Sequence, residues 1–263
     1  MTVDQCPQSE DAVLGGRLRL RQLRRGHRIG HDAVLLAAAC PGHAGERAVD
    51  LGAGVGAAGL ALAARVEDIS VTLVEVDARL AALARENAKL NGLHARVDVA
   101  NLDVAAPPHD FAAAGLLPDS VMRVLMNPPF NDPARQRASP DSVRRSAHVA
   151  QPRMLAAWVR TSARLLRPSG TLTLIWRADA LGEVLNVLTR AFGAVTVLPV
   201  HSKPQQPAVR VVVRATKGSR APLRLLPGFA LNDDTGGPTA AAEAVLRGGA
   251  TLPLAQSSLT RLP

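Results

Sequence analysis

Four consecutive residues, Asn127-Pro128-Pro129-Phe130, combine side chains that can act together on a nitrogen nucleophile. The exocyclic amine of a nucleobase attacks poorly because its lone pair is delocalised into the ring. Two acceptors for the amine protons, the Asn127 side-chain oxygen and the Pro128 carbonyl, would favour a tetrahedral nitrogen whose lone pair can attack. The prolines fix the backbone, and Phe130, with Pro129 beside it, offers a face for an unstacked base. The tetrapeptide therefore predicts direct in-line transfer to an amine, without a metal or a covalent enzyme intermediate.

The same tetrapeptide has a purely structural interpretation, because proline ends strands and asparagine favours turns. Its position favours the functional interpretation. Asn127 follows the fourth predicted strand of a chain that also carries a glycine turn and spaced acids.

Those acids and glycines form a second group of candidate binding residues. The stretch VDLGAGVGAAGL (49–60) predicts a strand, a tight turn and the start of a helix, so the backbone can approach a ligand and offer free N–H groups. Glu75 ends the next predicted strand, where it can accept hydrogen bonds from two ribose hydroxyls. Asp103 ends the third predicted strand at the same sheet edge, which is where such sheets bind ligands.

Two ligands compete for the turn. Gly52, Gly54 and Ala57 nearly fit the dinucleotide fingerprint GxGxxG/A, whereas Asp50-x-Gly52-x-Gly54-x-Gly56 resembles motif I of the S-adenosylmethionine (SAM)-dependent methyltransferases. Asp50 favours SAM, because a carboxylate suits the ammonium of a methionine group and would repel a pyrophosphate. A turn that merely packs a helix on a strand is the third alternative.

The elements that must position these residues follow from alternating short β-branched runs and longer helical patterns. This alternation predicts βαβ units and a parallel sheet covered by helices on both faces. The link between the last two predicted strands, HSKPQQP, is too short for a crossover helix, so those strands should be antiparallel neighbours. We therefore expect a Rossmann-like α/β fold whose mostly parallel, seven-stranded sheet has one reversed strand. The strands are expected near 47–52, 70–77, 95–103, 121–127, 170–176, 193–200 and 208–215.

Around this sheet the chain divides into three parts of one structural domain: a basic N-terminal segment (1–30), the SAM-binding domain (31–218) and a C-terminal cover segment and tail (219–263). Residues 131–150 are expected to form a polar loop. The helical patterns lie at 33–40, from about 152 to 167, at 179–191 and at 239–247.

Positive charge is concentrated in three stretches of a chain whose net charge is +9. Residues 17–28, 135–167 and 203–224 carry 20 of the 31 Lys and Arg residues, which predicts a positive face for a phosphate backbone. A general bias toward arginine is the alternative explanation. The arginines expected to bind RNA beside the base pocket are Arg135, Arg137, Arg144 and Arg145.

Other features exclude some classes of protein. No apolar window approaches the roughly 20 residues that span a bilayer, and the polar, acidic N-terminus is unlike a secretory signal, which favours a cytoplasmic protein without a membrane partner. The two cysteines show no CxxC pairing, and the seven histidines lack metal-site spacing. We expect neither a disulfide nor a metal site, and nothing indicates an oligomeric state.

Taken together, these motifs resemble those of the bacterial tRNA adenine-N6-methyltransferases that modify the adenine 3′ of the anticodon in a valine tRNA. The likeness runs from about residue 11 to 250. It rests on VDLGAGVGAAGL, LVEVD and NPPFND, and on LGGRLRLRQLRRGHRIGHDAVLLAAA and VRVVVRATKGSRAPLRLLPGFAL. Guanine-N2 rRNA and adenine-N6 DNA methyltransferases share the tetrapeptide, and release-factor glutamine methyltransferases have it usually ending in Tyr, so it indicates the reaction better than the substrate.

The resemblance implies a class I methyltransferase fold, SAM as the methyl donor and tRNA, or another structured RNA with an accessible base, as the partner. It implies that Gly52 and Gly54 pass under the methionine end of SAM. Glu75 would hold the ribose, Asp103 the adenine amine, and Asn127 with Pro128 the acceptor amine. The residues implied to cap the donor are Gln22, Arg28 and Asp32, of which Asp32 has an alternative role as the N-cap of helix 33–40.

Three other functions remain open at this point. Guanine-N2 methylation of rRNA and glutamine methylation of a protein use the same chemistry. The basic clusters disfavour a small protein loop as substrate. A noncatalytic RNA-binding subunit with this fold is the third, and the presence of Asp50, Glu75 and the Asn127 tetrapeptide argues against it.

Overall fold

A computed structural model describes residues 7–24, 29–129 and 141–256, with side chains for all of these except 141–152. The strands are β1 (Gln8–Val13), β2 (Leu18–Leu23), β3 (Arg47–Leu51), β4 (Ser70–Glu75), β5 (Val97–Asn101), β6 (Val121–Met126), β7 (Leu166–Arg177), β8 (Phe192–His201), β9 (Ala208–Lys217), β10 (Arg224–Leu225) and β11 (Phe229–Ala230). The helices are α1 (His31–Ala39), α2 (Ala57–Arg65), α3 (Ala78–Leu90), α4 (Pro108–Ala113), α5 (Asp141–Leu165), α6 (Leu181–Leu188) and α7 (Ala240–Leu246). Short 3-10 turns are η2 (Leu14–Gly16), η3 (Ala178–Ala180) and η4 (Pro253–Ala255).

The central sheet has the strand order β10-β8-β9-β7-β6-β3-β4-β5, and β11 also pairs with β8. Strand β9 is antiparallel to both β7 and β8, whereas the other long strands pair in parallel. The expected Rossmann-like α/β fold with one reversed strand is therefore confirmed, including the antiparallel pairing of the last two long strands. We define the carboxyl edge of the sheet as the edge where β3, β4, β5, β6 and β7 end, and the amino edge as the opposite one.

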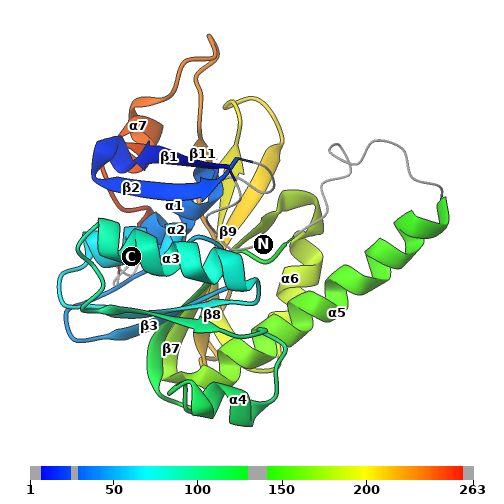
Figure 1. Ribbon diagram of the computed structural model, residues 1–263. Helices are drawn as coiled ribbons and strands as arrows, with labels where there is room; N and C mark the ends of the chain where they lie inside the picture. The colour runs from blue at the N-terminus through cyan, green and yellow to red at the C-terminus, as the bar shows by residue number, and fades with distance from the viewer. Residues whose placement is uncertain (1–6, 25–28, 130–140, 257–263) are drawn as a thin grey trace.

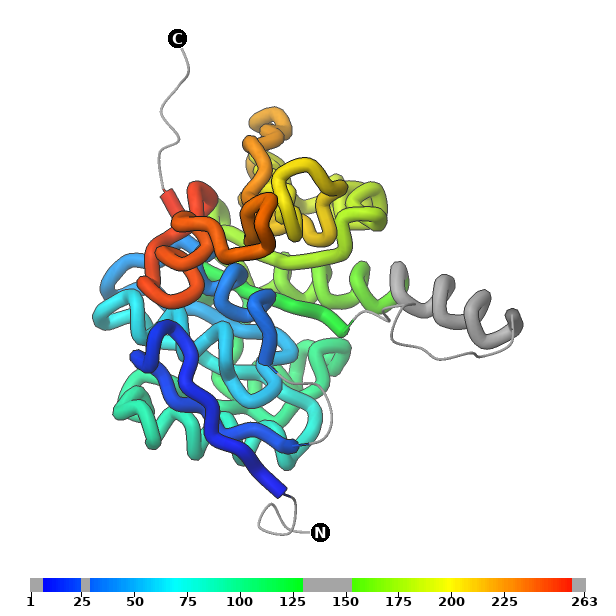
Figure 2. Tube along the Cα trace, turned by 90° about the horizontal axis from the view of Figure 1, so that it is seen from above, coloured from blue at the N-terminus to red at the C-terminus, as the bar shows by residue number. Residues whose placement is uncertain are grey.

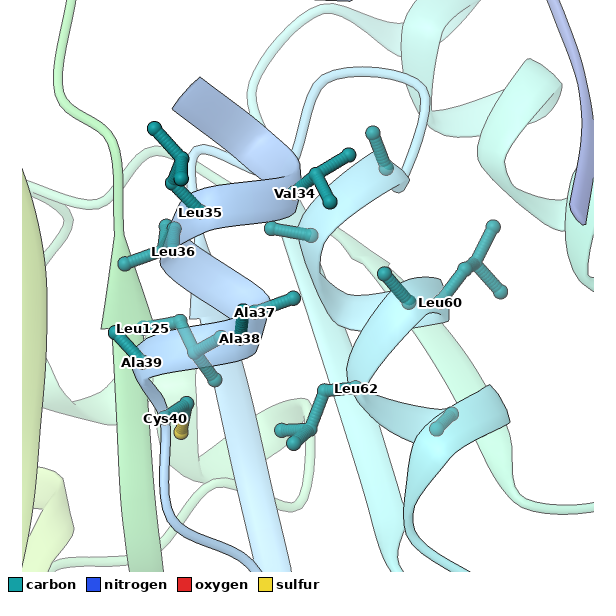
Figure 3. Close-up of a cluster of buried hydrophobic side chains, with 14 of the residues drawn as sticks. Val34, Leu35, Leu36, Ala37, Ala38, Ala39, Cys40, Leu60, Leu62 and Leu125 are labelled. Carbon is teal, nitrogen blue, oxygen red and sulfur yellow. The ribbon is translucent and has the colours of Figure 1, made fainter. Parts of the chain in front are cut away.

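Helices cover both faces of this sheet (Figure 1). One apolar cluster lies under α1, α2 and α3, and a second lies under α4, α5 and α6. Neighbouring residues of one strand face opposite clusters, as Val124 and Leu125 of β6 do. Figure 3 shows the first cluster, where residues of α1 and α2 gather beside Leu125. The central strands are buried on both sides, as expected for a parallel sheet.

The N-terminal stretch forms an antiparallel hairpin of β1 and β2, outside the central sheet. Leu18 and Leu20 of β2 are buried, while Arg19 and Arg21 between them are exposed. The arginine-rich run is thus an alternating strand with one apolar face. It packs on α3, and its contacts are described below.

Helix α5 differs from the expectation for this region. It begins at Asp141, so the expected polar loop over 131–150 is wrong for residues 141–150. The sequence predicts that a helix starts at about Pro152, but Pro152 lies inside α5. The preceding residues include alanine, arginine and glutamine but no glycine, and these types favour a helix enough to extend it through the proline. Helix α7, in contrast, lies within the range 239–247 that the sequence predicts.

The C-terminal segment, expected to be irregular apart from one helix, adds two short strands to the sheet. Both β10 and β11 pair in parallel with β8, which would otherwise be the exposed edge strand. Beyond α7 the chain returns to α1, where the Leu252 N–H donates to the Ala38 carbonyl at 2.9 Å. The Arg214 guanidinium of β9 donates to the carbonyls of Leu254 and Gln256.

In the described part of the chain, no helix combines the length and the apolar character needed to cross a membrane.

Candidate functional site

The predicted site residues follow neighbouring strands at the carboxyl edge. Strand β3 lies between β4 and β6, and its last residue, Leu51, is level with Val74 and Met126. The glycine turn after β3, Glu75 at the end of β4 and Asn127 after β6 are therefore brought to one place. In sheets of this type the position where neighbouring connections diverge to opposite faces is the usual ligand site.

The glycine turn requires glycine for two different reasons. Gly52, Gly54 and Gly56 have φ values of +70°, +58° and +91°, a region that L side chains rarely adopt. A Cβ atom on Gly52 would also lie 2.3 Å from the Trp158 ring of α5, whereas one on Gly54 would meet no atom within 4 Å. The backbone at Gly54 therefore borders open space, and Trp158 rests on the turn next to it.

The Glu75 carboxylate is fixed against this turn. It is 7% exposed, its Oε2 accepts the Gly54 N–H at 2.7 Å, and its Oε1 accepts the Asp77 N–H at 2.9 Å. These two backbone donors hold the carboxylate beside the open space at Gly54. Because each carboxylate oxygen has two lone pairs, both oxygens can accept a further hydrogen bond.

Asp50 lies beneath the turn and is only 2% exposed. Its Oδ2 accepts the Gly59 N–H at 2.8 Å, so it stabilises the first turn of α2, whose N-cap, Gly56, has no side chain. Burial, with a smaller contribution from the charge of Glu75, raises the pKa of Asp50 to about 7 against the lowering effect of the Gly59 N–H. The expected contact of Asp50 with a ligand ammonium stays a prediction.

Two residues follow the ends of the neighbouring strands β5 and β4 at this edge: Asp103, which is expected to contact the adenine of the donor, and Val76, which the sequence did not single out. Asp103 is exposed after β5, and its Oδ1 accepts the Ala105 N–H at 2.8 Å. Val76, directly after Glu75, is 64% exposed. The Asn101 side chain donates to the carbonyls of Glu75 and Val76 and holds this backbone. The available signal for Val76 was an apolar residue directly after the acid that ends a strand.

Asn127 has an unusual hydrogen-bonding state. Its side-chain Oδ1 is buried and, in the described part of the chain, has no hydrogen-bond partner. Pro128 is buried and Pro129 is exposed. A buried acceptor without a donor costs about 1–3 kcal/mol, so such a group is expected mainly where a ligand or water supplies the donor.

Three further residues, all in the N-terminal part of the chain, are expected to cover the bound donor, and the structure describes two of them. Gln22 is 3% exposed, donates to Asp11 at 2.6 Å and accepts the Ile29 N–H at 3.0 Å. Asp32 is not the N-cap of α1, which is Gly30; it lies in the first turn and accepts from Arg210 at 3.0 Å. Arg28 lies outside the described residues.

The remaining expectations concern the base pocket and its arginines. Phe130, Arg135 and Arg137 lie outside the described residues, and Arg144 and Arg145 belong to the part of α5 whose side chains are not described. Their roles stay predictions. Among the described side chains, no group of three His, Cys, Asp or Glu residues comes together as a metal site.

Some of the basic side chains form ion pairs with acidic residues of the same chain. Arg19 and Arg21 pair with Glu10 across the hairpin, and Arg210 pairs with Asp32. Lys217 binds Asp119 at 2.6 Å. These side chains contribute to folding contacts, so the number of basic residues overstates how many are free for an anionic partner. On α5, Arg153 and Arg160 are exposed.

Comparison with known proteins agrees with this geometry. Residues 27–203 match the family described as methyltransferase small domain. The chain is 30% identical over 203 residues to a tRNA1(Val) (adenine(37)-N6)-methyltransferase of Aeromonas hydrophila, covering 73% of this chain and 77% of that protein. A protein of the same name from Serratia proteamaculans is 29% identical over 195 residues, covering 72% of this chain and 71% of that one.

Solved structures show the same architecture. A predicted O-methyltransferase from Agrobacterium tumefaciens is similar with a TM-score of 0.71 and 31% identity, over 84% of this chain and 98% of that one. A 16S rRNA N2 G1207 methyltransferase of T. thermophilus, solved with AdoMet and guanosine, shares the fold with a TM-score of 0.54 and 21% identity, over 80% of this chain and 50% of that one. The chain therefore belongs to the methyltransferase small domain family and is a SAM-dependent methyltransferase.

Proposed function

We propose that this protein transfers a methyl group from SAM to the exocyclic N6 amine of an adenine in tRNA. The observation that carries the proposal is the buried Oδ1 of Asn127, which has no partner among the described residues and lies next to the glycine turn at the carboxyl edge. An acceptor in this state suits a ligand that donates N–H groups. The tRNA and the adenine are suggested by the relatives from Aeromonas and Serratia.

The residues around the turn fit the donor. When bound, SAM supplies an electrophilic methyl group on a sulfonium. The open space at Gly54 leaves room for the methionine end, and the free lone pairs of Glu75 can accept two ribose hydroxyls. Val76 offers an apolar contact for the adenine ring, with Asp103 near its amine. Asp50 would act on the methionine end from below.

On the acceptor side, Asn127 Oδ1 and the Pro128 carbonyl would each accept one proton of the adenine amine. This arrangement favours a tetrahedral nitrogen, whose lone pair attacks the methyl carbon in line with the breaking C–S bond. The new N–C bond forms as the sulfur leaves with the electron pair, and one amine proton is then lost to solvent. Most of the rate acceleration would come from holding the adenine amine and the methyl group next to each other in the reactive orientation.

The base must leave its stack to reach this edge, either as a flipped or as a single-stranded nucleotide. Phe130 and Pro129 would contact its face. Arg135, Arg137, Arg144 and Arg145 would bind the neighbouring phosphates, which predicts an affinity for RNA that falls with salt.

The decisive experiment incubates the protein with methyl-labelled SAM and total RNA from cells that lack this activity, and then identifies the labelled nucleoside and its RNA. We expect N6-methyladenosine in tRNA, and no label with Asn127→Ala. Labelled N2-methylguanosine in rRNA, or label only in protein, would replace the proposed substrate. No transfer to any substrate, despite SAM binding, would favour a noncatalytic RNA-binding role.

A further inference from the structure

Asn87 of α3 joins two parts of the molecule that are far apart in the sequence. Its side chain is fully buried. Its Oδ1 accepts the Arg21 N–H of β2 at 2.7 Å, and its Nδ2 donates to the Arg21 carbonyl at 3.0 Å. The same Nδ2 donates to the carbonyl of Val55, in the glycine turn, at 3.0 Å. One carboxamide thus pairs with β2 as a neighbouring strand would, and also restrains the turn.

Asn91, one helical turn later, makes a matching set of contacts with one difference. It accepts the Arg19 N–H at 2.9 Å and donates to the Arg19 carbonyl at 2.8 Å. Its other donation goes to the Asn87 carbonyl, within α3, at 2.7 Å. Both asparagines therefore dock the hairpin on α3, where Figure 2 shows it lying, but of this pair it is Asn87 that also reaches the glycine turn.

The docked hairpin continues toward α1 through Gln22. This residue accepts the Ile29 N–H and so holds the chain that leads into the helix. A continuous set of hydrogen bonds consequently runs from Val55 through Asn87 and Arg21 to the neighbouring Gln22 and on to Ile29. A change in the glycine turn and a change in hairpin docking both act on the same carboxamide.

The turn is a place where such a restraint matters. Its three glycines with positive φ give the unbound backbone more freedom than any other residue type would. Fixing the Val55 carbonyl reduces the conformational entropy that the turn loses when a ligand binds. By linkage, a ligand that favours the fixed turn must favour the docked hairpin by the same free energy.

We propose that Asn87 couples the donor site to the N-terminal hairpin, so that SAM bound at the glycine turn and the hairpin docked on α3 stabilise each other. Asn87 is in this sense a positioning residue for the donor. The inference rests on the proposed placement of SAM at the glycine turn.

Two matched pairs of variants test the coupling on the full chain. Asn87→Ala removes the link to the turn together with both hydrogen bonds to Arg21. Asn91→Ala removes both hydrogen bonds to Arg19 and the donation to the Asn87 carbonyl, but no contact with the turn. Arg21→Pro removes the backbone N–H that Asn87 accepts, and Arg19→Pro removes the one that Asn91 accepts, so the second pair leaves both asparagines in place. Thermal melts establish that each variant is folded, and the proline pair provides the test if Asn87→Ala is not.

Two measurements are made on these variants: the Kd for SAM by calorimetry, and hydrogen exchange of residues 18–23 with and without SAM. We expect Asn87→Ala and Arg21→Pro to weaken SAM binding roughly fivefold or more, and their controls less than twofold. SAM should slow exchange in the hairpin of the wild type and of Asn91→Ala, but not of Asn87→Ala. If Asn87 only packed the hairpin on α3, its loss would not remove the effect of SAM on hairpin exchange.

Equal losses of SAM affinity in Asn87→Ala and Asn91→Ala would overturn the coupling, and so would SAM binding that leaves hairpin exchange unchanged in the wild type. Those outcomes leave the proposed function intact. A wild-type protein that binds no SAM would overturn both proposals, and a wild type with coupled SAM binding but no RNA methylation would overturn only the proposed function.

Discussion

At the amino edge of the central sheet the buried Arg123 is fully engaged, whereas at the carboxyl edge Asn127 lacks a partner within the described residues. Arg123 binds Glu46 through Nη2 at 2.6 Å and Nε at 2.8 Å, and it donates to Thr171 at 3.1 Å. Burial would raise the pKa of Glu46, but the hydrogen bonds and charge of Arg123, together with the hydrogen bonds from His43, outweigh it and lower that pKa. The carboxyl edge instead combines the unpaired Asn127 oxygen, the raised pKa of Asp50 and glycines with positive φ. At the amino edge Arg123 and Glu46 match each other, whereas the carboxyl edge leaves groups that a ligand can match.

The largest expected effect is on catalysis, from Asn127→Ala at the carboxyl edge. Loss of an acceptor aimed at the reacting amine should lower kcat by on the order of 100- to 1000-fold, about 3–4 kcal/mol. The Kd for SAM should stay nearly unchanged, and Asn127→Asp, which keeps an acceptor, should lose less. Single-turnover methylation and calorimetry measure the two quantities. A parallel loss of SAM binding would reassign Asn127 to the donor.

The corresponding change at the amino edge is Arg123→Met, which should affect stability and leave kcat unchanged. It leaves the partly buried Glu46 carboxylate without its main partner, so the free energy of unfolding should fall by about 2–3 kcal/mol. Urea unfolding measures this loss. Adding Glu46→Gln, which removes the second charge, should recover part of it. If Arg123→Met lowered kcat at a temperature where it is folded, the two edges would not be separable in this way.

The smallest change per measured step is a pH dependence at the carboxyl edge, where one pH unit alters the free energy of unfolding by less than the free-energy change expected from either substitution. The pKa of Asp50 is about 7 in the folded protein against 3.8 as the reference value. Between these values only the folded state binds the proton, so the free energy of unfolding should fall as pH rises, by at most about 1.4 kcal/mol per pH unit. Below and above this window the protonation of Asp50 does not change the free energy of unfolding with pH.

Asp50→Asn cannot titrate but keeps an oxygen that can accept the Gly59 N–H. Its stability, measured by urea unfolding across the same pH window, should therefore fall less steeply than that of the wild type. Other groups contribute equally to both proteins, so the difference between the two curves isolates Asp50. Parallel curves would mean that Asp50 is ionised throughout the window.

Most of the fold was predictable because it depends on local patterns. Alternating β-branched and helical runs indicated the seven long strands, and the short link after His201 indicated the reversed one. The N-terminal hairpin was not predicted. LRLRQL alternates apolar and polar residues as a strand does, but its arginines were interpreted only as a source of positive charge. The strands β10 and β11 have two residues each, too few for any periodicity, and they exist because β8 offers an unpaired edge.

The site was predictable to the extent that it follows strand ends. Parallel strands bring their carboxyl ends together, so Glu75 and Asn127 could be assigned to one edge from spacing alone. Asn87 and Trp158 could not be found this way. Their contacts with the glycine turn depend on how α3 and α5 pack, and asparagine or tryptophan inside a helix carries no local signal of such a partner.

The return of the chain from α7 to α1 bears on how the protein is made. The seven strands from β3 to β9 are all synthesised before Leu252 can bind Ala38, and before Arg214 can bind Leu254. A nascent chain that has just completed β9 would leave the apolar surface of α1 and the edge of β8 open. During that interval the apolar surface and the strand edge are open to association with other chains.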